Sequence, residues 1–201
     1  MNSMTYTYGI QKLGDLADIR SGYLFKGALP EDASGDVSVV QVKDLKAGQP
    51  IGWENCARVA EGRLMNEARL RRGLVIFSAK GSRNFAWHID DQPDFAIANS
   101  LFHVIDARSP EIDPAFLAWQ INQPKAQGWI DNASAGVTVR NVKISALRDL
   151  PVVVPPIEIQ LKIASYESAA AAERRALKAL IQNREREMRG IAATILSGKT
   201  T

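Results

Sequence analysis

Three short stretches of the sequence combine basic and polar side chains that could bind a nucleic acid. The stretches are RSGYLFKG, SAKGSRN and TVRNVK. Arginine, lysine, asparagine, serine and threonine are the residue types that contact phosphates and base edges. The candidate contacts are Arg20, Tyr23 and Lys26 in the first stretch, Lys80, Ser82, Arg83 and Asn84 in the second, and Thr138, Arg140, Asn141 and Lys143 in the third. Each stretch alone is also typical of a solvated loop, and three together favour binding.

The rest of the sequence offers no assembled catalytic motif. His88 and His103 lack a second histidine, a cysteine or paired carboxylates at the spacing of a metal site. The aspartates within 90–94 are typical of an acidic turn. The closing SGKTT resembles the end of a phosphate-binding loop, but Ala193 stands where such a loop needs glycine. We therefore predict a binding protein that has no enzymatic activity, cofactor or metal of its own.

The composition is that of an ordinary globular protein. The chain has 201 residues, of which 46% are hydrophobic and 23% charged, enough for one or two domains. Its apolar runs are far shorter than the roughly 18 residues that a membrane-spanning helix needs, and the N-terminus does not read as a signal peptide. Cys56 is the single cysteine, which excludes a disulfide framework. We expect a cytoplasmic protein without membrane contact.

The net charge of +3 is unevenly distributed along the chain. From Ile157 onward there are eight basic residues and five glutamates, whereas the part before Ile157 is neutral. Within that neutral part, the segment from Arg63 to Arg83 has six basic residues and one acid, and an acidic segment follows. Such segregation can orient an anionic partner, although a solvated basic face would read in the same way.

Hydrophobic spacing and turn residues predict a mixed α/β (α+β) globular body over residues 1–156. Helices are expected at 13–19, where leucines and an isoleucine have helical spacing, and after the N-cap Asp113, which Pro114 follows. Strands are expected at 37–45, 74–79, 95–106 and 151–154, with a short helix and turn across 57–73.

After Pro155 and Pro156 the pattern changes to one long C-terminal helix of coiled-coil type over residues 157–201. Proline near the first helical position costs no hydrogen bond, and its φ is already helical, so the pair predicts a rigid strand-to-helix corner. A helix from Ile157 to Ser197 would be ~60 Å long, longer than a compact body of this size is wide. A helix folded back as a hairpin on the body is the alternative.

One face of this helix carries an apolar seam. Its residues step by alternating four and three positions, with one shift of register, which is typical of a helix that pairs with a partner helix. The seam residues are Ile159, Ile163, Tyr166, Leu177, Leu180, Met188, Ile191 and Ile195. We expect two copies to form a homodimer through this face, because a symmetric interface is the commonest way for identical chains to associate.

Five segments make the chain resemble the DNA specificity subunit of type I restriction–modification systems, and in particular one target recognition domain with its following helix. The segments are KLGDLADIRSG, VSVVQVKDLKAGQPI, LRRGLVIFSAKGS, IDPAFLAWQIN and, most specific of all, ISALRDLPVVVPPIEIQLKIA. Leu74 departs from the aspartate that the family often has after this glycine, and Ile159 stands where an acidic or polar residue is usual. Full subunits resemble two such units in tandem, so this chain resembles a natural half subunit or a fragment.

The resemblance implies that the body reads one half of a split target in the major groove of double-stranded DNA. It implies that the long helix sets the distance between half sites and docks the methyltransferase (modification) subunits, in a complex that a restriction subunit can join. The specificity subunit of the family does no chemistry. The alternative is a coiled-coil protein–protein adaptor without DNA specificity.

Overall fold

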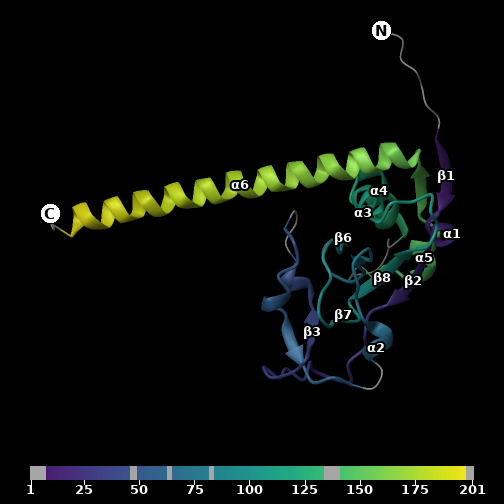
Figure 1. The fold of residues 1–201 in the computed structure, drawn as a ribbon, viewed down its shortest axis with the longest axis horizontal. Helices are drawn as coiled ribbons and strands as arrows, with labels where there is room; N and C mark the ends of the chain where they lie inside the picture. Colours follow the sequence, from purple (N-terminus) through teal and green to yellow (C-terminus); the bar gives the residue numbers. More distant parts are fainter. Residues whose placement is uncertain (1–7, 46–48, 63–64, 82–83, 134–140, 198–201) are drawn as a thin grey trace, which may run out of the picture.

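The structure, a computed structural model, describes residues 8–45, 49–62, 65–81, 84–133 and 141–197. It consists of a mixed α/β body from which one helix, α6 (Ile157–Leu196), extends far to one side (Figure 1). The predicted fold class and the long C-terminal helix are confirmed. The helical hairpin is not formed, because α6 is continuous over 40 residues.

A four-stranded antiparallel sheet forms the centre of the body, with strand order β2-β8-β5-β6. Side chains alternate between the two faces of this sheet, and both faces are covered. Ile19, Phe77 and Ile105 face helices in one core cluster, whereas Ile76 and Val104 belong to a second cluster with residues of a smaller sheet. The strands are β2 (Ala17–Ser21), β8 (Phe102–Ala107), β5 (Val75–Ser78) and β6 (Ala86–His88).

The smaller sheet has three strands in the order β4-β3-β7, with β3 antiparallel to β4 and parallel to β7. Its central strand is buried along its whole length, which explains its nearly unbroken run of valines. The strands are β4 (Ala57–Val59), β3 (Val37–Val40) and β7 (Ala96–Ala98), and the short helices η1 (Val42–Asp44), η2 (Trp53–Asn55) and α2 (Met65–Ala68) connect the chain around them.

Helices and a two-stranded sheet close the other face. The two strands are β1 (Gly9–Lys12) and β9 (Pro151–Val154), and the helices are α1 (Leu13–Leu16), α3 (Pro114–Ile121), α4 (Pro124–Ala133) and α5 (Ile144–Arg148). Side-chain amides near the end of α3 complete two strand edges. Gln120 exchanges two hydrogen bonds with the backbone of Val153 (2.7 and 2.9 Å), and Asn122 does the same with Ala86 (2.9 and 2.8 Å).

Several predicted elements are present, but shorter than expected. The strand predicted at 74–79 is β5, and Asp113 caps α3 by accepting a hydrogen bond from the Phe116 amide at 2.8 Å. The helix predicted at 13–19 stops at Leu16, because pairing with β8 turns Ile19 into a buried strand residue. The strand predicted at 37–45 ends at Val40, since the Asp44 carboxylate accepts from the backbone amide of Gln41 and tightens the chain into η1.

The predicted segment 57–73 also divides. Its beginning pairs with β3 as strand β4, and only Met65–Ala68 is helical. Gly73 ends the segment with a φ of 88°, a conformation in which a side chain would be strained. The segment 95–106, predicted as a strand pair or one long bent strand, forms the two strands β7 and β8.

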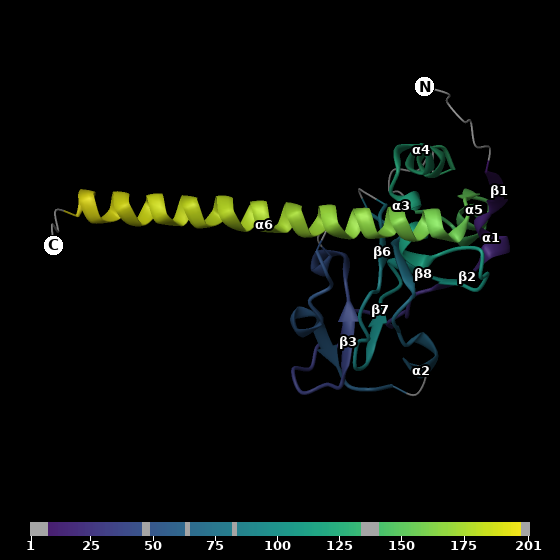
Figure 2. The same cartoon turned by 45° about the horizontal axis from the view of Figure 1, so that its top comes forward.

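One buried amide fixes the direction in which α6 leaves the body. The side chain of Gln160 is fully buried and makes three hydrogen bonds to backbone groups. Its Nε2 donates to the carbonyls of Glu111 and Pro155, both at 2.7 Å, and its Oε1 accepts from the amide of Asp113 at 2.9 Å. The first turns of α6 are thereby joined to the start of α3, and α3 packs against α6 (Figure 2).

Beyond these first turns, α6 leaves the body behind. Every residue from Ala172 to Leu196 is exposed. The apolar side chains among them include Leu177 (54% exposed), Met188 (63%) and Ile195 (71%). These apolar side chains are exposed, so their burial contributes nothing to the stability of α6.

We predict that Gln160→Leu lowers the free energy of unfolding by about 3 kcal/mol or more, because three buried backbone groups lose their partners. Gln160→Glu has the same shape and should also destabilise at neutral pH, since its carboxylate would face two carbonyl oxygens. Urea unfolding measures both. Gln182→Leu, on the exposed part of α6, is the control and should change stability by no more than about 0.5 kcal/mol. A Gln160→Glu protein as stable as the wild type would contradict this role of the amide.

Candidate nucleic-acid interface

Parts of all three predicted binding stretches meet at one end of the four-stranded sheet, where β2 and β5 end and β8 begins. The turn at 99–102 lies between them. Its Phe102 carbonyl accepts from the Gly22 amide (2.9 Å), and its Leu101 carbonyl accepts from the amides of Ala79 (2.8 Å) and Lys80 (3.3 Å). We call this region the loop end of the sheet; it comprises residues 22–26, 80–81, 99–101 and 141–143.

The third stretch is attached to the loop end through Val142. The Val142 amide donates to the carbonyl of Ala79 at 2.9 Å, and Asn141 forms an isolated β-bridge with Lys80. The carbonyl of Val142 lies 2.7 Å from Nε2 of the buried His103. Because a carbonyl can only accept, Nε2 carries the proton and Nδ1 has a lone pair, which has no hydrogen-bond partner among the described residues.

The exposed side chains of the loop end are basic or neutral. Lys26, Lys80, Asn141 and Lys143 are all exposed, and segments 22–26, 80–81, 99–101 and 141–143 contain no acidic residue. None of the three lysines has an ion-pair partner among the described residues. Uncompensated ammonium groups on neighbouring loops give a positive potential that attracts phosphates.

Other predicted contacts take different positions. The ring of Tyr23 is half-buried and packs against Phe25 and the core beneath the small sheet. Asn84 is buried, and its Nδ2 donates to the carbonyl of Ser78 at 2.7 Å, so it shapes the loop from inside. The remaining four candidates, Ser82, Arg83, Thr138 and Arg140, lie outside the described residues.

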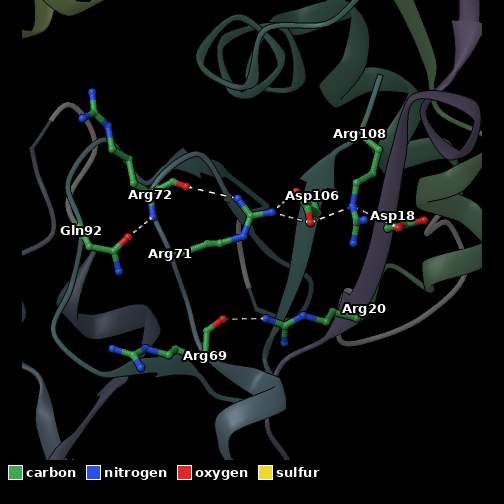
Figure 3. A network of polar contacts seen from close by, with 8 residues as sticks. All are labelled: Asp18, Arg20, Arg69, Arg71, Arg72, Gln92, Asp106 and Arg108. Atoms are coloured by element: carbon green, nitrogen blue, oxygen red, sulfur yellow. Dashed lines mark hydrogen bonds and ion pairs between the residues drawn. The ribbon is translucent and has the colours of Figure 1, made fainter. Parts of the chain in front are cut away.

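Arg20 belongs to a separate polar network on one face of the main sheet, across β2 and β8 (Figure 3). Its guanidinium is half-buried and donates to the carbonyls of Ala68 (3.2 Å) and Arg69 (3.3 Å). This burial lowers the pKa of Arg20, while the charge of Asp106 acts in the opposite direction. The interactions of Arg20 are therefore directed into the protein, and they tie β2 to the segment that follows α2.

The same network continues from Asp106 toward the other end of the sheet (Figure 3). Both carboxylate oxygens of Asp106 accept from Arg71 at 2.7 Å, and one also accepts from Arg108 at 2.9 Å. Arg108 lies 3.3 Å from Asp18 as well. Because these arginines are already paired with carboxylates, we assign this cluster a structural role.

Sequence reasoning missed three features of the loop end. The turn at 99–102 holds the loops together, and His103 holds the third stretch, although the sequence shows His103 only as an isolated histidine. Position 22 requires glycine because a Cβ there would lie 2.1 Å from the carbonyl oxygen of Asn99. The glycine itself is the only signal in the sequence, because the segment before it was predicted as a helix rather than a strand.

The described residues offer no other assembled site. They contain no group of three or more histidine, cysteine or acidic side chains that could hold a metal ion. Burial raises the pKa of the Cys56 thiol to about 12, which keeps it protonated and unreactive. Within the same residues, no helix combines the length and apolar character needed to cross a bilayer.

Comparison with known proteins connects this geometry to a family. Residues 7–182 match the family model of the type I restriction modification DNA specificity domain. No curated protein matches the sequence. The S subunit of a type I restriction–modification system from M. genitalium is similar in structure, with a TM-score of 0.64 and 18% identity over 97% of this chain.

Two further solved structures share the fold. One, from work on complex assembly and conformational transition of the type I R-M system, has a TM-score of 0.68 and 14% identity over 98% of this chain. The HsdS subunit from Thermoanaerobacter tengcongensis has a TM-score of 0.60 and 14% identity, also over 98%. This chain covers 47%, 47% and 45% of the three matched chains, and thus spans about half their length.

We predict that the free energy of unfolding falls as the pH drops from 7 to 5, and that His103→Gln reduces this fall. Burial, chiefly, lowers the pKa of His103 below its ordinary value of 6.5, so the unfolded chain binds the proton more readily than the folded one. The stability is fully present above pH 6.5 and is lost below it. Burial lowers the pKa of His88 too, so His88→Gln is the control that keeps the His103 contribution. Equal pH dependence in wild type and His103→Gln would contradict the prediction.

Proposed function

Since this chain belongs to the family of type I restriction modification DNA specificity domains, we propose that it recognises DNA sequence through the loop end of its sheet. The observation that carries the proposal is the meeting of three separate stretches at the loop end, with three lysines that have no ion-pair partner among the described residues. The body, residues 1–156, would read one half of a split double-stranded target. This chain spans about half the length of the matched subunits, and a split target needs a second reading unit.

We assign the second unit to another copy of the chain, paired through α6. The seam supports antiparallel pairing, because its spacing is the same from both ends. Starting at Ile159 the first steps are four and three, and starting backward from Ile195 they are again four and three. Antiparallel helices can therefore place Ile159 opposite the partner's Ile195, and Tyr166 opposite the partner's Met188, with Leu177 at the two-fold axis; Ile163 packs against its own body instead.

Such a dimer would carry its two bodies at opposite ends of a shared helical spacer, with residues 157–201 as the spacer. The two-fold symmetry of the dimer would make the target a palindrome. A helix of 40 residues is ~60 Å long, so the two halves of the palindrome would be separated by a gap. We further propose that α6 docks the methyltransferase (modification) subunits, and that a restriction subunit joins this complex. The chain itself would do no chemistry, need no cofactor and work in the cytoplasm, where its DNA target is found. Family membership does not favour the adaptor without DNA specificity.

We predict that Lys80→Ala and Lys143→Ala each weaken DNA binding and lower the slope of log K against log salt by about one unit, because each removes one phosphate contact. The full chain, alone and with the methyltransferase subunit of the same system, first selects a duplex from a random library. Fluorescence anisotropy then gives its affinity between 50 and 200 mM salt.

Lys12→Ala is the matched control. Lys12 is exposed but paired with Asp149 at 2.8 Å, in the small β1-β9 sheet, and its removal should leave the salt slope unchanged. Failure to enrich any sequence, with either protein preparation, would refute DNA recognition by this chain. Enrichment with unchanged salt slopes in both lysine variants would refute only the placement of the interface at the loop end.

We predict that the wild-type chain sediments as a dimer at tens of micromolar and that Leu177→Asp with Leu180→Asp converts it to a monomer. An aspartate at 177 would face its own copy at the two-fold axis, where like charges repel, and an aspartate at 180 would place a second charge in the apolar seam. The paired variant Lys178→Asp with Gln182→Asp is the control, because both positions lie off the seam on exposed α6. A monomeric wild type would contradict the homodimer, and circular dichroism shows whether each variant keeps its fold.

A further inference from the structure

Leu24 is an exposed apolar side chain at the centre of the first binding stretch. It is 74% exposed, whereas its neighbours Tyr23 and Phe25 turn inward. The two rings meet edge to face, with centroids 4.8 Å apart, and pack against the core that contains Val39 and Ile97. The aromatic rings therefore anchor the loop on both sides of Leu24 and leave the leucine outside.

The backbone before Leu24 is fixed as well. The amide of Tyr23 donates to the carbonyl of Ala98 at 2.7 Å, and the amide of Gly22 donates to that of Phe102 at 2.9 Å. Gly22 also lies so close to Asn99 that a side chain would not fit between them. Because the backbone before Leu24 is held in this way, Leu24 can contact a ligand with little further loss of backbone conformational entropy.

The exposure of Leu24 alone does not indicate a binding site, because single surface leucines are common. The position of Leu24 is what matters: it lies at the loop end, two residues before the exposed Lys26, among segments that carry Lys80 and Lys143. Lysines bind phosphates without regard to sequence. The apolar group that a base pair displays in the major groove is the C5 methyl of thymine.

We propose that Leu24 contacts the C5 methyl group of a thymine in the target and thereby specifies one base pair. This inference rests on the proposed DNA recognition and assigns one of its specificity-determining residues. It replaces Tyr23, which the sequence suggested, because the ring of Tyr23 is used for anchoring. The contact adds no charge, so it should contribute to affinity without contributing to the salt dependence.

The test removes the two partners of the contact one at a time. A duplex selected by the wild-type chain is synthesised with deoxyuridine in place of each thymine in turn, which deletes only the methyl group. At one position per half site we expect affinity for the wild type to fall about fourfold, the effect of one lost methyl-sized contact. Leu24→Ala should bind the thymine duplex correspondingly less well and should not distinguish thymine from deoxyuridine at that position.

Two comparisons make the result specific. Leu161→Ala, an equally simple truncation at a 51% exposed leucine of α6, should keep the full preference for thymine. The salt slope of Leu24→Ala should equal that of the wild type.

If the wild type does not bind DNA, the proposed function itself fails. If it binds but no thymine methyl matters, or if Leu24→Ala keeps the preference, the assignment of Leu24 is wrong. A loss of affinity and DNA bending together, without a methyl effect, would instead identify a wedge between base steps.

Discussion

The buried amide of Gln160 is the interaction on which the arrangement of the whole chain depends. A polar group in the interior is costly unless every hydrogen-bonding atom has a partner, and this amide has a partner for both of its polar atoms. Its partners belong to the entry into α3 and to the Pro155 corner before α6. The direction of the longest element is thus decided by three short hydrogen bonds rather than by the extent of its packing.

The same chemistry recurs at the edges of the sheets. Gln120 and Asn122 each use both ends of an amide to imitate a neighbouring strand, for β9 and β6 respectively. Open strand edges invite pairing with other chains, and an amide that satisfies one residue of an edge closes it without adding a strand. Helix α3 therefore acts as the central connector between the β1-β9 sheet, the main sheet and α6.

The sequence predicted the parts of this molecule that depend on local pattern. The buried strand β5, the Asp113 cap and the single long helix all follow from spacing, caps and prolines that lie next to one another in the chain. It did not predict what depends on pairing between distant segments. Residues 17–21 become a strand only because β8 lies beside them, and β1 exists only through β9. The site shows the same division: the basic stretches were visible, whereas the turn that joins them was not.

Individual residues make this limit concrete. Tyr23 and Asn84 are of types that bind nucleic acids, yet the structure uses both to hold a loop from within. Leu24, whose type suggests a core position, is the one that remains outside. Side-chain type therefore indicates what a residue can do, and only the packing of its neighbours decides which way it faces.

The way in which the loop end is held has a consequence for how this protein can evolve. The segments are joined mainly by backbone amides and carbonyls, from Gly22 to Phe102, Ala79 to Leu101 and Val142 to Ala79. Backbone groups are the same for almost every residue type, so the outward side chains can be replaced without loosening the frame. Replacement of these few side chains would thus change what the loop end can contact at little cost in folding, whereas replacement of Gly22 or His103 would disturb the frame itself.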